Sequence, residues 1–408
     1  MSSGEPRYVR GARLAAAWVM TILAATALAA CDNDRSWSLP DAEWQWADLG
    51  GPDAATPELV GNHETLVVTN DTLLLGTADG VWRRPLGGTA DWERAGLEGR
   101  TVQALAQSAD GARLVAAGYD ARDEQLPTAW YSLTGGQDWI AAAAWPRAAP
   151  GQPDAGVGFR FAALEPDPLD ADVLYGNLDA DTVAVTVDGG ATWLLSDGAT
   201  MPNFGYPCVA HRPRGARVLL QGCELPLDVA WVGARDVDSD DRFTLANFRF
   251  LFGYPDLQEI GNRRINSIVP VSGRDDRILV GVEGGLLELT ATDGEWSHRD
   301  AIDSHVLYRS DGDNPNRPYA YIRAIAPLSS TGRRVLFGGT VNGANAVLSL
   351  FETTNGGLTV RRVPAPPSFI DPRVEQAIVL AANDVLLVIS DIDAADRRSS
   401  SVYRLRRP

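Results

Sequence analysis

Short apolar runs that end in glycine recur along this chain of 408 residues. Six of them are LLLG, LVAAG, VLYG, VLLQG, ILVG and VLFG, which end at Gly76, Gly118, Gly176, Gly222, Gly281 and Gly338, and a seventh run, VLLVIS, ends at Ser390. Successive ends are separated by 42 residues (Gly76 to Gly118) up to 59 residues (Gly222 to Gly281), enough for four short strands and their turns. This repeat overrules the two or three domains that chain length alone would suggest.

The segments around these runs follow a common order. A first strand with apolar positions, such as residues 102–106 or 322–326, is followed by a polar turn, the glycine-ended run, a third strand, a Gly-rich turn and a fourth strand that often carries Trp. No convincing amphipathic helix follows residue 30, and four-stranded sheets repeated radially form a propeller. We therefore predict for residues 43–408 an all-β fold, a seven-bladed β-propeller of four-stranded antiparallel blades. Weak first and fourth strands in the fourth and fifth units leave the count open between six and eight.

The two ends of the repeat region predict how the ring closes. Residues 43–50 (EWQWADLG) are similar to residues 91–98 (DWERAGLE), which form the expected outer strand of the first unit. The last unit stops at residues 401–405, one strand short of four. We expect the N-terminal strand to complete the last blade, which removes an exposed sheet edge.

The N-terminal segment has the pattern of a targeting signal. Three arginines lie within residues 7–13, and an uncharged run fills residues 14–30. The run is short for a membrane span and ends in small residues, which favours a cleaved signal peptide over residues 1–30. Its end, Leu28-Ala29-Ala30-Cys31, resembles the lipobox of bacterial lipoproteins, which implies lipidation of Cys31 and a tether over residues 31–42. The alternative is an ordinary signal peptide with a chance cysteine.

That resemblance implies a protein anchored by lipid in the bacterial cell envelope, facing the periplasm or the exterior, with the choice of inner or outer membrane open. The net charge of −17 becomes −19 once the three arginines and one glutamate of residues 1–30 are removed. Such acidity argues against nucleic acid as a partner. All 36 basic residues are arginine, so chemistry that requires lysine is excluded.

Two cysteines remain once Cys31 is assigned to lipid. Cys208 and Cys223 lie on either side of a turn-like segment at residues 213–216, so a hairpin would place them opposite each other. We predict a disulfide between them, with two buried thiols as the alternative. The four histidines and three cysteines form no zinc-type spacing, so we expect no metal and no cofactor.

The stretch TVDGGATW at residues 186–193 raises the question of catalysis, because an Asp beside two glycines could belong to a metal loop or an active site. It resembles the Asp-box, the S/T-x-D-x-G-x-T-W repeat of sialidases, sortilin-like receptors, some glycoside hydrolases and photosystem-assembly propellers. Five residues match that pattern: Thr186, Asp188, Gly190, Thr192 and Trp193. Degenerate copies lie at residues 132–139, 290–296 and 353–360. The resemblance implies a structural turn between the third and fourth strands, in which the Trp packs between blades.

No residue set points to catalysis. The FRIP motif of sialidases is absent, since residues 248–251 (FRFL) match it poorly, and so is a G-x-S-x-G elbow. The acidic run at residues 236–241 fails the calcium-loop pattern and is better explained as a solvated hairpin tip. We therefore predict no catalytic residue. A glycoside hydrolase or related hydrolase that uses carboxylates at the channel mouth is the second hypothesis.

The loops opposite the Asp-box turns supply the candidate binding residues. Connections from the second to the third strand and from the fourth strand to the next blade share one face of a propeller. Acids follow most of the glycine-ended runs there: Asp79, Asp120, Asp179, Glu224, Glu283 and Asp393. Aromatic residues fill the long loops between blades: Phe204, Tyr206, Phe252, Tyr254, Tyr308, Tyr319 and Tyr321. We predict that this face binds a protein or glycan, as in a scaffold, receptor or assembly factor. The alternative is that these aromatic turns only pack over neighbouring blades.

Overall fold

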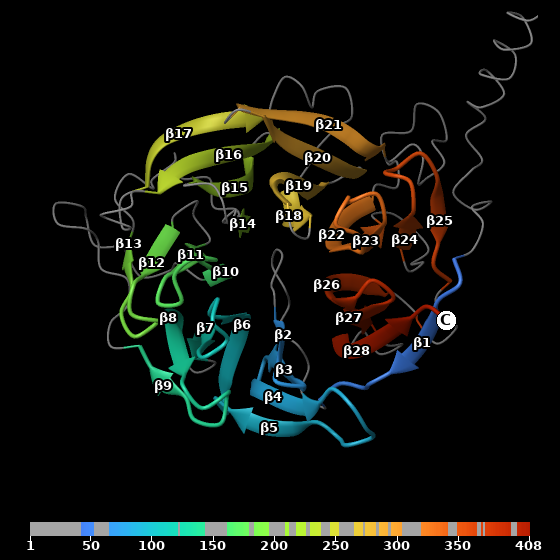
Figure 1. Ribbon diagram of the computed structural model, residues 1–408. Coiled ribbons are helices and arrows are strands. Elements are labelled where there is room, and N and C mark those ends of the chain that lie inside the picture. Colours follow the sequence, from blue (N-terminus) through green and yellow to red (C-terminus); the bar gives the residue numbers. More distant parts are fainter. Residues whose placement is uncertain are drawn as a thin grey trace, which may run out of the picture.

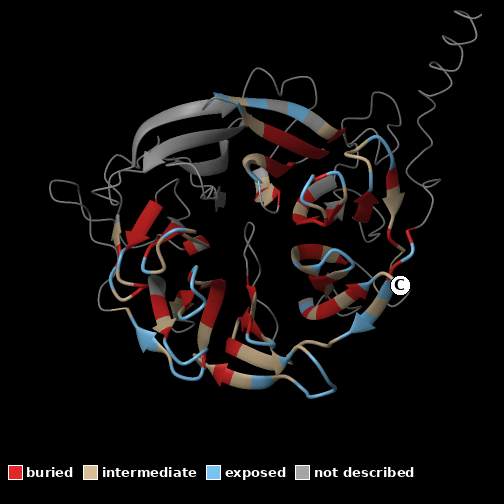
Figure 2. Cartoon of the chain, viewed as in Figure 1, coloured by how far each residue is buried: buried red, intermediate tan, exposed pale blue. Residues whose placement is uncertain are grey.

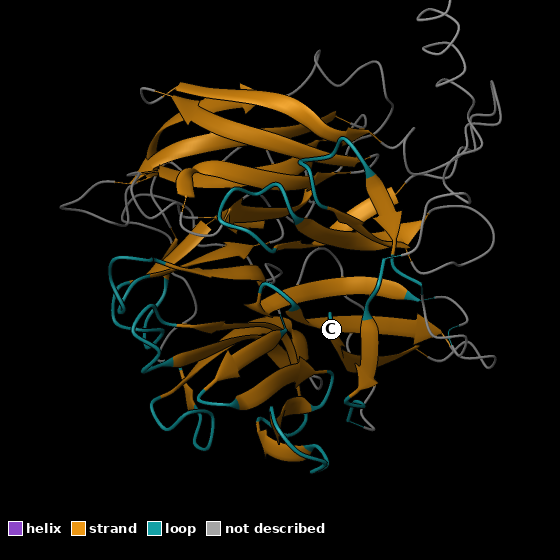
Figure 3. Ribbon diagram, turned by 45° about the vertical axis from the view of Figure 1, so that its right-hand side comes forward, coloured by secondary structure: helices purple, strands orange, loops and turns teal. Residues whose placement is uncertain are grey.

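The computed structural model describes residues 42–52, 65–120, 123–142, 161–178, 183–195, 209–211, 218–225, 229–237, 245–252, 265–271, 274–282, 285–292, 295–303, 320–341, 349–364, 369, 372–392 and 398–408. Strands and loops make up all of this described part (Figure 3). Within it, no helix is long and apolar enough to cross a membrane.

The described strands form seven four-stranded antiparallel sheets arranged around a ring (Figure 1). We number these blades in chain order. Blade 1 contains β2 (Leu66–Thr69), β3 (Thr72–Thr77), β4 (Gly80–Pro85) and β5 (Glu93–Gly96), and blade 2 contains β6 (Arg100–Gln107), β7 (Leu114–Asp120), β8 (Asp123–Ser132) and β9 (Ile140–Ala141). Blade 3 contains β10 (Phe161–Pro166), β11 (Leu174–Leu178), β12 (Val183–Thr186) and β13 (Leu194–Leu195), and blade 4 contains β14 (Val209–His211), β15 (Val218–Leu225), β16 (Val229–Val237) and β17 (Leu245–Phe252).

The remaining strands complete the ring. Blade 5 contains β18 (Ile265–Val271), β19 (Arg274–Val282), β20 (Gly285–Thr292) and β21 (Glu295–Asp303). Blade 6 contains β22 (Ala320–Pro327), β23 (Val335–Val341), β24 (Ser349–Thr353) and β25 (Val360–Arg362). Blade 7 contains β26 (Arg373–Ala381), β27 (Asp384–Ile392), β28 (Arg398–Arg406) and, as its outer strand, β1 (Gln45–Asp48).

The prediction of a seven-bladed propeller requires a correction. Six blades are described with packed side chains, whereas blade 4 is given by its backbone pairing alone (Figure 2). The fold that is described with its side chains is thus an all-β ring of six four-stranded blades, and the backbone of a further sheet, β14–β17, lies between blades 3 and 5.

The ring closes through the N-terminal strand, as the similarity between residues 43–50 and 91–98 predicts. β1 pairs with β28 in an antiparallel register that joins Gln45 to Arg406 and Asp48 to Tyr403. The indole N–H of Trp46 donates a hydrogen bond of 2.8 Å to the Pro364 carbonyl of blade 6. The chain therefore enters the ring at the outer edge of blade 7 (Figure 1).

Each described hydrophobic core lies between two adjacent blades rather than inside one blade. Five such clusters are described, between blades 1 and 2, 2 and 3, 5 and 6, 6 and 7, and 7 and 1. The repeating glycines lie where these blades meet. A Cβ on Gly76 would come within 2.7 Å of Val102 in the next blade, and one on Gly281 within 2.3 Å of the Ile322 carbonyl. The glycine-ended runs are therefore required by close packing between blades.

Candidate binding surface

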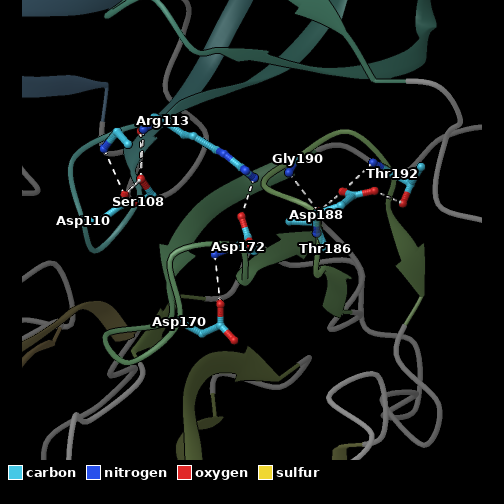
Figure 4. A network of polar contacts seen from close by, with 10 residues as sticks. Ser108, Asp110, Arg113, Asp170, Asp172, Thr186, Asp188, Gly190 and Thr192 are labelled. Carbon is cyan, nitrogen blue, oxygen red and sulfur yellow. Dashed lines mark hydrogen bonds and ion pairs between the residues drawn. The ribbon is translucent and has the colours of Figure 1, made fainter.

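The turn of residues 186–193 is held by its own side chains (Figure 4). The Thr186 hydroxyl donates to Asp188 Oδ1 at 2.8 Å and accepts a hydrogen bond from the Gly190 backbone N–H at 2.9 Å. Asp188 Oδ1 accepts the Thr192 backbone N–H at 2.9 Å, and Asp188 Oδ2 accepts the Thr192 hydroxyl at 2.6 Å. Gly189 and Gly190 have φ of 72° and 97°, which favour glycine. The Asp carboxylate thus serves the turn itself.

Two further turns repeat this geometry with different residues. In blade 2, Ser132 accepts the Gly136 N–H at 2.9 Å, and Thr134 accepts the Asp138 N–H at 2.8 Å. In blade 6, Thr353 accepts the Gly357 N–H at 2.9 Å, and Asn355 accepts the Thr359 N–H at 2.8 Å. Thr and Asn can replace Asp because the turn requires an oxygen acceptor for a backbone N–H and requires no charge. This interchange supports the predicted structural role.

The residues after the turn close the interface between blades. Trp193 is 1% exposed and packs edge-to-face on Phe161, with ring centroids 5.1 Å apart, in the cluster between blades 2 and 3. In blade 2 the corresponding Trp139 donates its indole N–H to the Ala95 carbonyl of blade 1 at 3.2 Å. Both tryptophans therefore contact the preceding blade.

The electrostatics of Asp188 also fit a structural carboxylate. Burial acts to raise its pKa, but hydrogen bonds from Thr192 and Thr186 outweigh burial, and the pKa lies below its ordinary value. The carboxylate is therefore ionised at neutral pH. Among the described residues, no three His, Cys, Asp or Glu side chains are grouped to hold a metal ion.

The turns of the blades lie on two opposite faces of the ring, and hydrogen bonds connect turns on each face. We call the side with the turns between first and second and between third and fourth strands the turn face. There the Gly189 N–H donates to the Asp172 carbonyl, and the Gly356 N–H donates to the Arg333 carbonyl, both at 2.8 Å. On the opposite connection face, the Gly99 N–H donates to Asp79 Oδ1 at 2.8 Å, which joins the β3–β4 turn to the β5–β6 connection.

Asp79 is the candidate binding acid whose side chain the structure describes. Its other oxygen forms a 2.6 Å ion pair with Arg94, which also donates to the Asp79 carbonyl at 2.9 Å. The hydrogen bond from Arg94 and then that from Gly99 hold the pKa of this carboxyl below its ordinary value. Both carboxylate oxygens are thus engaged, one with the β5–β6 connection and the other with β5 of the same blade.

The other candidate residues lie partly or wholly outside the described part of the chain. Asp120, Glu224, Phe252 and Tyr321 lie on β7, β15, β17 and β22, where only their backbone is described. Phe204, Tyr206, Tyr254, Tyr308, Tyr319, Asp179, Glu283 and Asp393 fall outside the described residues, as do Cys31, Cys208 and residues 1–41. Val209 pairs with Gly222, which is the register of the predicted hairpin around residues 213–216, and Cys223 lies on β15. Their roles in binding, lipidation and a disulfide stay predictions.

Sequence reasoning missed a set of buried glutamates that join neighbouring strands and blades. Glu352 is fully buried and accepts from Arg334 Nε at 2.9 Å, Arg407 at 2.8 Å and the Trp44 indole at 3.1 Å. Glu288 pairs with two arginines of its own blade, and Glu375 pairs with Arg323 of blade 6 at 2.7 Å. An acid within an apolar strand is the only signal in the sequence, and it does not name the arginine partner.

Sequence reasoning also missed apolar side chains on the surface. The large hydrophobic side chains that are exposed among the described residues are Leu133, Ile140, Leu169, Val187, Leu358 and Val379. Four of them lie in turns of the turn face, and Ile140 and Val379 lie within a few residues of such turns. A nearby depression of about 440 Å³ beside β5 contains Arg83 and Arg94, but both arginines are already paired with carboxylates.

Comparisons with known proteins identify the type of fold. No family model matches the sequence, and no curated protein matches it. YCF48 from Cyanidioschyzon merolae is similar in structure with a TM-score of 0.51 and 14% identity, over 90% of this chain and 99% of that chain. Sqt1 from Saccharomyces cerevisiae gives a TM-score of 0.50 and 13% identity, over 88% of each chain. The chain is a β-propeller. At such low identity the likeness shows the fold alone.

Proposed function

We propose that this β-propeller is a lipid-anchored, extracytoplasmic protein that binds a protein partner and catalyses no reaction itself. It would act as a scaffold, receptor or assembly factor, with a glycan as the alternative partner. The observation that carries the proposal is the direction of the pKa shifts of the described carboxyl groups. These shifts bear on the choice because the competing hypothesis is a hydrolase that uses carboxyl groups for catalysis.

A glycoside hydrolase requires a carboxyl group whose pKa is raised, so that it can donate a proton at neutral pH. In the described part of the chain, the shifted carboxyl pKa values all lie below the ordinary value, for Asp79, Asp110, Asp188, Asp276 and Asp384. Hydrogen bonds from neighbouring side chains account for these shifts. These acids are built into turns and ion pairs, which supports a binding scaffold over a hydrolase.

The anchor is proposed from the Leu28–Cys31 motif and from the point where the chain enters the ring. Twelve residues (32–43) separate Cys31 from Trp44, and β1 forms the outer edge of blade 7. A short tether attached to the rim leaves the two faces of the propeller available to partners. Cys31→Ala should prevent the mobility shift of lipidation and move the protein out of the membrane fraction. Unchanged mobility and fractionation would remove the anchor from the proposal.

The three repeated turns are proposed to be Asp-box repeats, and the aromatic loops of the connection face to be a binding surface. The test is chemical crosslinking and capture of the full chain in native membranes. We expect the same protein partner with wild type and with Asp79→Asn, and its loss in a Tyr206→Ala and Tyr254→Ala double variant. Unchanged capture by the double variant would reject this face as the binding surface. If the purified chain instead releases sugar from a polysaccharide panel and Glu224→Gln abolishes that release, the protein is a hydrolase.

A further inference from the structure

The turn face carries apolar side chains at positions where the fold does not require them. Leu133 and Val187 occupy the second position of their turns, between the hydroxyl and acceptor residues that make the hydrogen bonds. They are 57% and 39% exposed, and Leu169, in the β10–β11 turn, is 66% exposed. A polar residue would keep every described hydrogen bond of these turns and would suit water better. Three such side chains on neighbouring turns form a surface that is suited to contact with another molecule.

Packing brings these turns of blades 2 and 3 together. A Cβ on Gly190 would lie 3.1 Å from Val115 and 3.4 Å from the Cβ of Tyr131, so the blade 3 turn rests on the strand end that leads into the blade 2 turn. Arg113 of blade 2 forms a 2.5 Å ion pair with Asp172 of blade 3 (Figure 4). Leu133, Leu169 and Val187 thus lie on neighbouring turns of the turn face, and we call the surface of these turns the blade 2–3 patch.

The blade 2–3 patch is strongly acidic. Its turns, residues 108–113, 132–140, 166–173 and 186–193, contain six aspartates, of which Asp167 is buried, and a single arginine, Arg113, which is paired. Figure 4 shows Asp110, Asp170, Asp172 and Asp188 gathered around this junction. Hydrogen bonds from Ser108 and the Ala112 N–H lower the pKa of Asp110, so its exposed carboxyl is charged at neutral pH.

The matching turns of blade 6 have the opposite charge. Residues 328–335 and 353–360 contain Arg333 and Arg334 and no acid. Leu358 is 85% exposed there. Both regions thus have exposed apolar side chains, but only the blade 2–3 patch has aspartates around them. An anionic membrane surface would be repelled by this charge, whereas a cationic segment would be attracted.

We propose that the blade 2–3 patch docks a segment of a partner protein in which leucine-like side chains are interspersed with arginine or lysine. The apolar side chains contact Leu133, Leu169 and Val187, and the cationic side chains lie against the surrounding aspartates. This inference rests on the proposed binding function and adds a second surface to it, because the candidate residues of the connection face lie on the opposite side.

The test uses the full chain in detergent and labelled 12-residue peptides. One peptide alternates leucine with arginine, a second alternates leucine with glutamate, and vesicles containing phosphatidylglycerol are the lipid probe. We expect fluorescence anisotropy to show binding of the Leu–Arg peptide only, weakened at least tenfold in Leu133→Ser/Leu169→Ser/Val187→Ser. Leu358→Ser is the matched control and should bind as wild type does. Asp138→Asn should weaken binding, and its effect should shrink as salt rises.

Several results would overturn the proposal. These are equal affinity of wild type and the triple variant, equal loss in Leu358→Ser, binding of the Leu–Glu peptide at the same strength, or vesicle binding that the triple variant loses. Unchanged thermal unfolding of the triple variant confirms that the fold is intact, as its exposed sites predict. The two proposals fail separately. Equal affinity of wild type and the triple variant for the Leu–Arg peptide rejects this patch and leaves the binding function standing, whereas the failure of wild type to capture any protein from native membranes rejects the function.

Discussion

Glu352 should control the closure of the ring, and Glu352→Gln tests this. The carboxylate accepts from Arg334 and Arg407 on Oε1 and from the Trp44 indole on Oε2. It thereby joins β24 of blade 6 to the segments that flank β1 and β28. A glutamine can keep its oxygen toward the two arginines only by turning its amide N–H₂ toward the indole N–H, so that two donors face each other.

The loss of stability in Glu352→Gln can be worked out from these contacts. Loss of charge weakens each arginine hydrogen bond by about 1 kcal/mol, and the unsatisfied indole adds about 1 to 2 kcal/mol. Arg334 and Arg407 are each about one-fifth exposed, so water recovers part of this loss. We expect the free energy of unfolding to fall by about 3 kcal/mol. If the whole loss lowers the free energy needed to detach β1 from blade 7, the fraction of molecules with β1 detached rises roughly a hundredfold, because about 1.4 kcal/mol is a factor of ten.

The assay is limited proteolysis of the folded protein, with cleavage within residues 43–52 followed by mass spectrometry. Glu288→Gln is the control, because Glu288 is also buried and bound by two arginines, Arg277 and Arg299, but lies inside blade 5. It should lower stability without accelerating cleavage near β1. Equal cleavage rates in the two variants would show that Glu352 stabilises the chain generally and does not hold the closure.

Three further variants test single contacts. Arg404 lowers the pKa of Asp384 below its ordinary value of 3.8, so the stabilisation is fully present well above pH 3.8 and is lost as pH falls through the lowered pKa. Asp384→Asn should therefore cost about 1 kcal/mol at pH 7, and its difference from wild type in urea unfolding should shrink as pH falls below 3.8. Asp188→Ala should lower the free energy of unfolding by about 1 to 2 kcal/mol. Asp188→Asn should lower it by less than half of that, because Asn355 makes the same backbone contact in the matching turn of blade 6. Equal losses in the two variants would contradict this account. Trp193→Ala should cost about 3 to 5 kcal/mol, and a thermal midpoint like that of wild type would refute its role between blades.

The elements that sequence reasoning predicted well are those with local or periodic causes. The glycine-ended runs form second strands because β-propensity and close packing act at the same positions in each unit. The turn at residues 186–193 was predictable because its hydrogen bonds span at most four residues. The closing strand was predictable because residues 43–50 are similar to an outer strand elsewhere in the chain.

The contacts that sequence reasoning missed join residues far apart in the chain. Glu352 meets Trp44 across 308 positions, and Gln376 binds both the N–H and the carbonyl of Leu66 across 310. No periodicity encodes such pairs, since each depends on how adjacent blades are placed. Asp79 shows the same limit at short range, because its position after a glycine suggested a free ligand while Arg94, on β5, was counted only as part of an outer strand.

Polar contacts between distant residues can determine which blades become neighbours, which hydrophobic packing alone does not. The cores between blades are built from similar Leu, Val, Ala and Ile side chains, and apolar burial is not directional, so each blade could pack acceptably against several others. The polar pairs differ at each junction: Gln107 with Thr69 between blades 1 and 2, Arg113 with Asp172 between blades 2 and 3, and Arg323 with Glu375 between blades 6 and 7. A wrong pairing of blades would leave Glu375 buried without Arg323, at a cost of several kcal/mol. Glu352 and Glu375, which pair across blades, therefore specify the order of the ring more than they add to its stability, and for that reason the control at Glu288, which pairs within its own blade, is decisive.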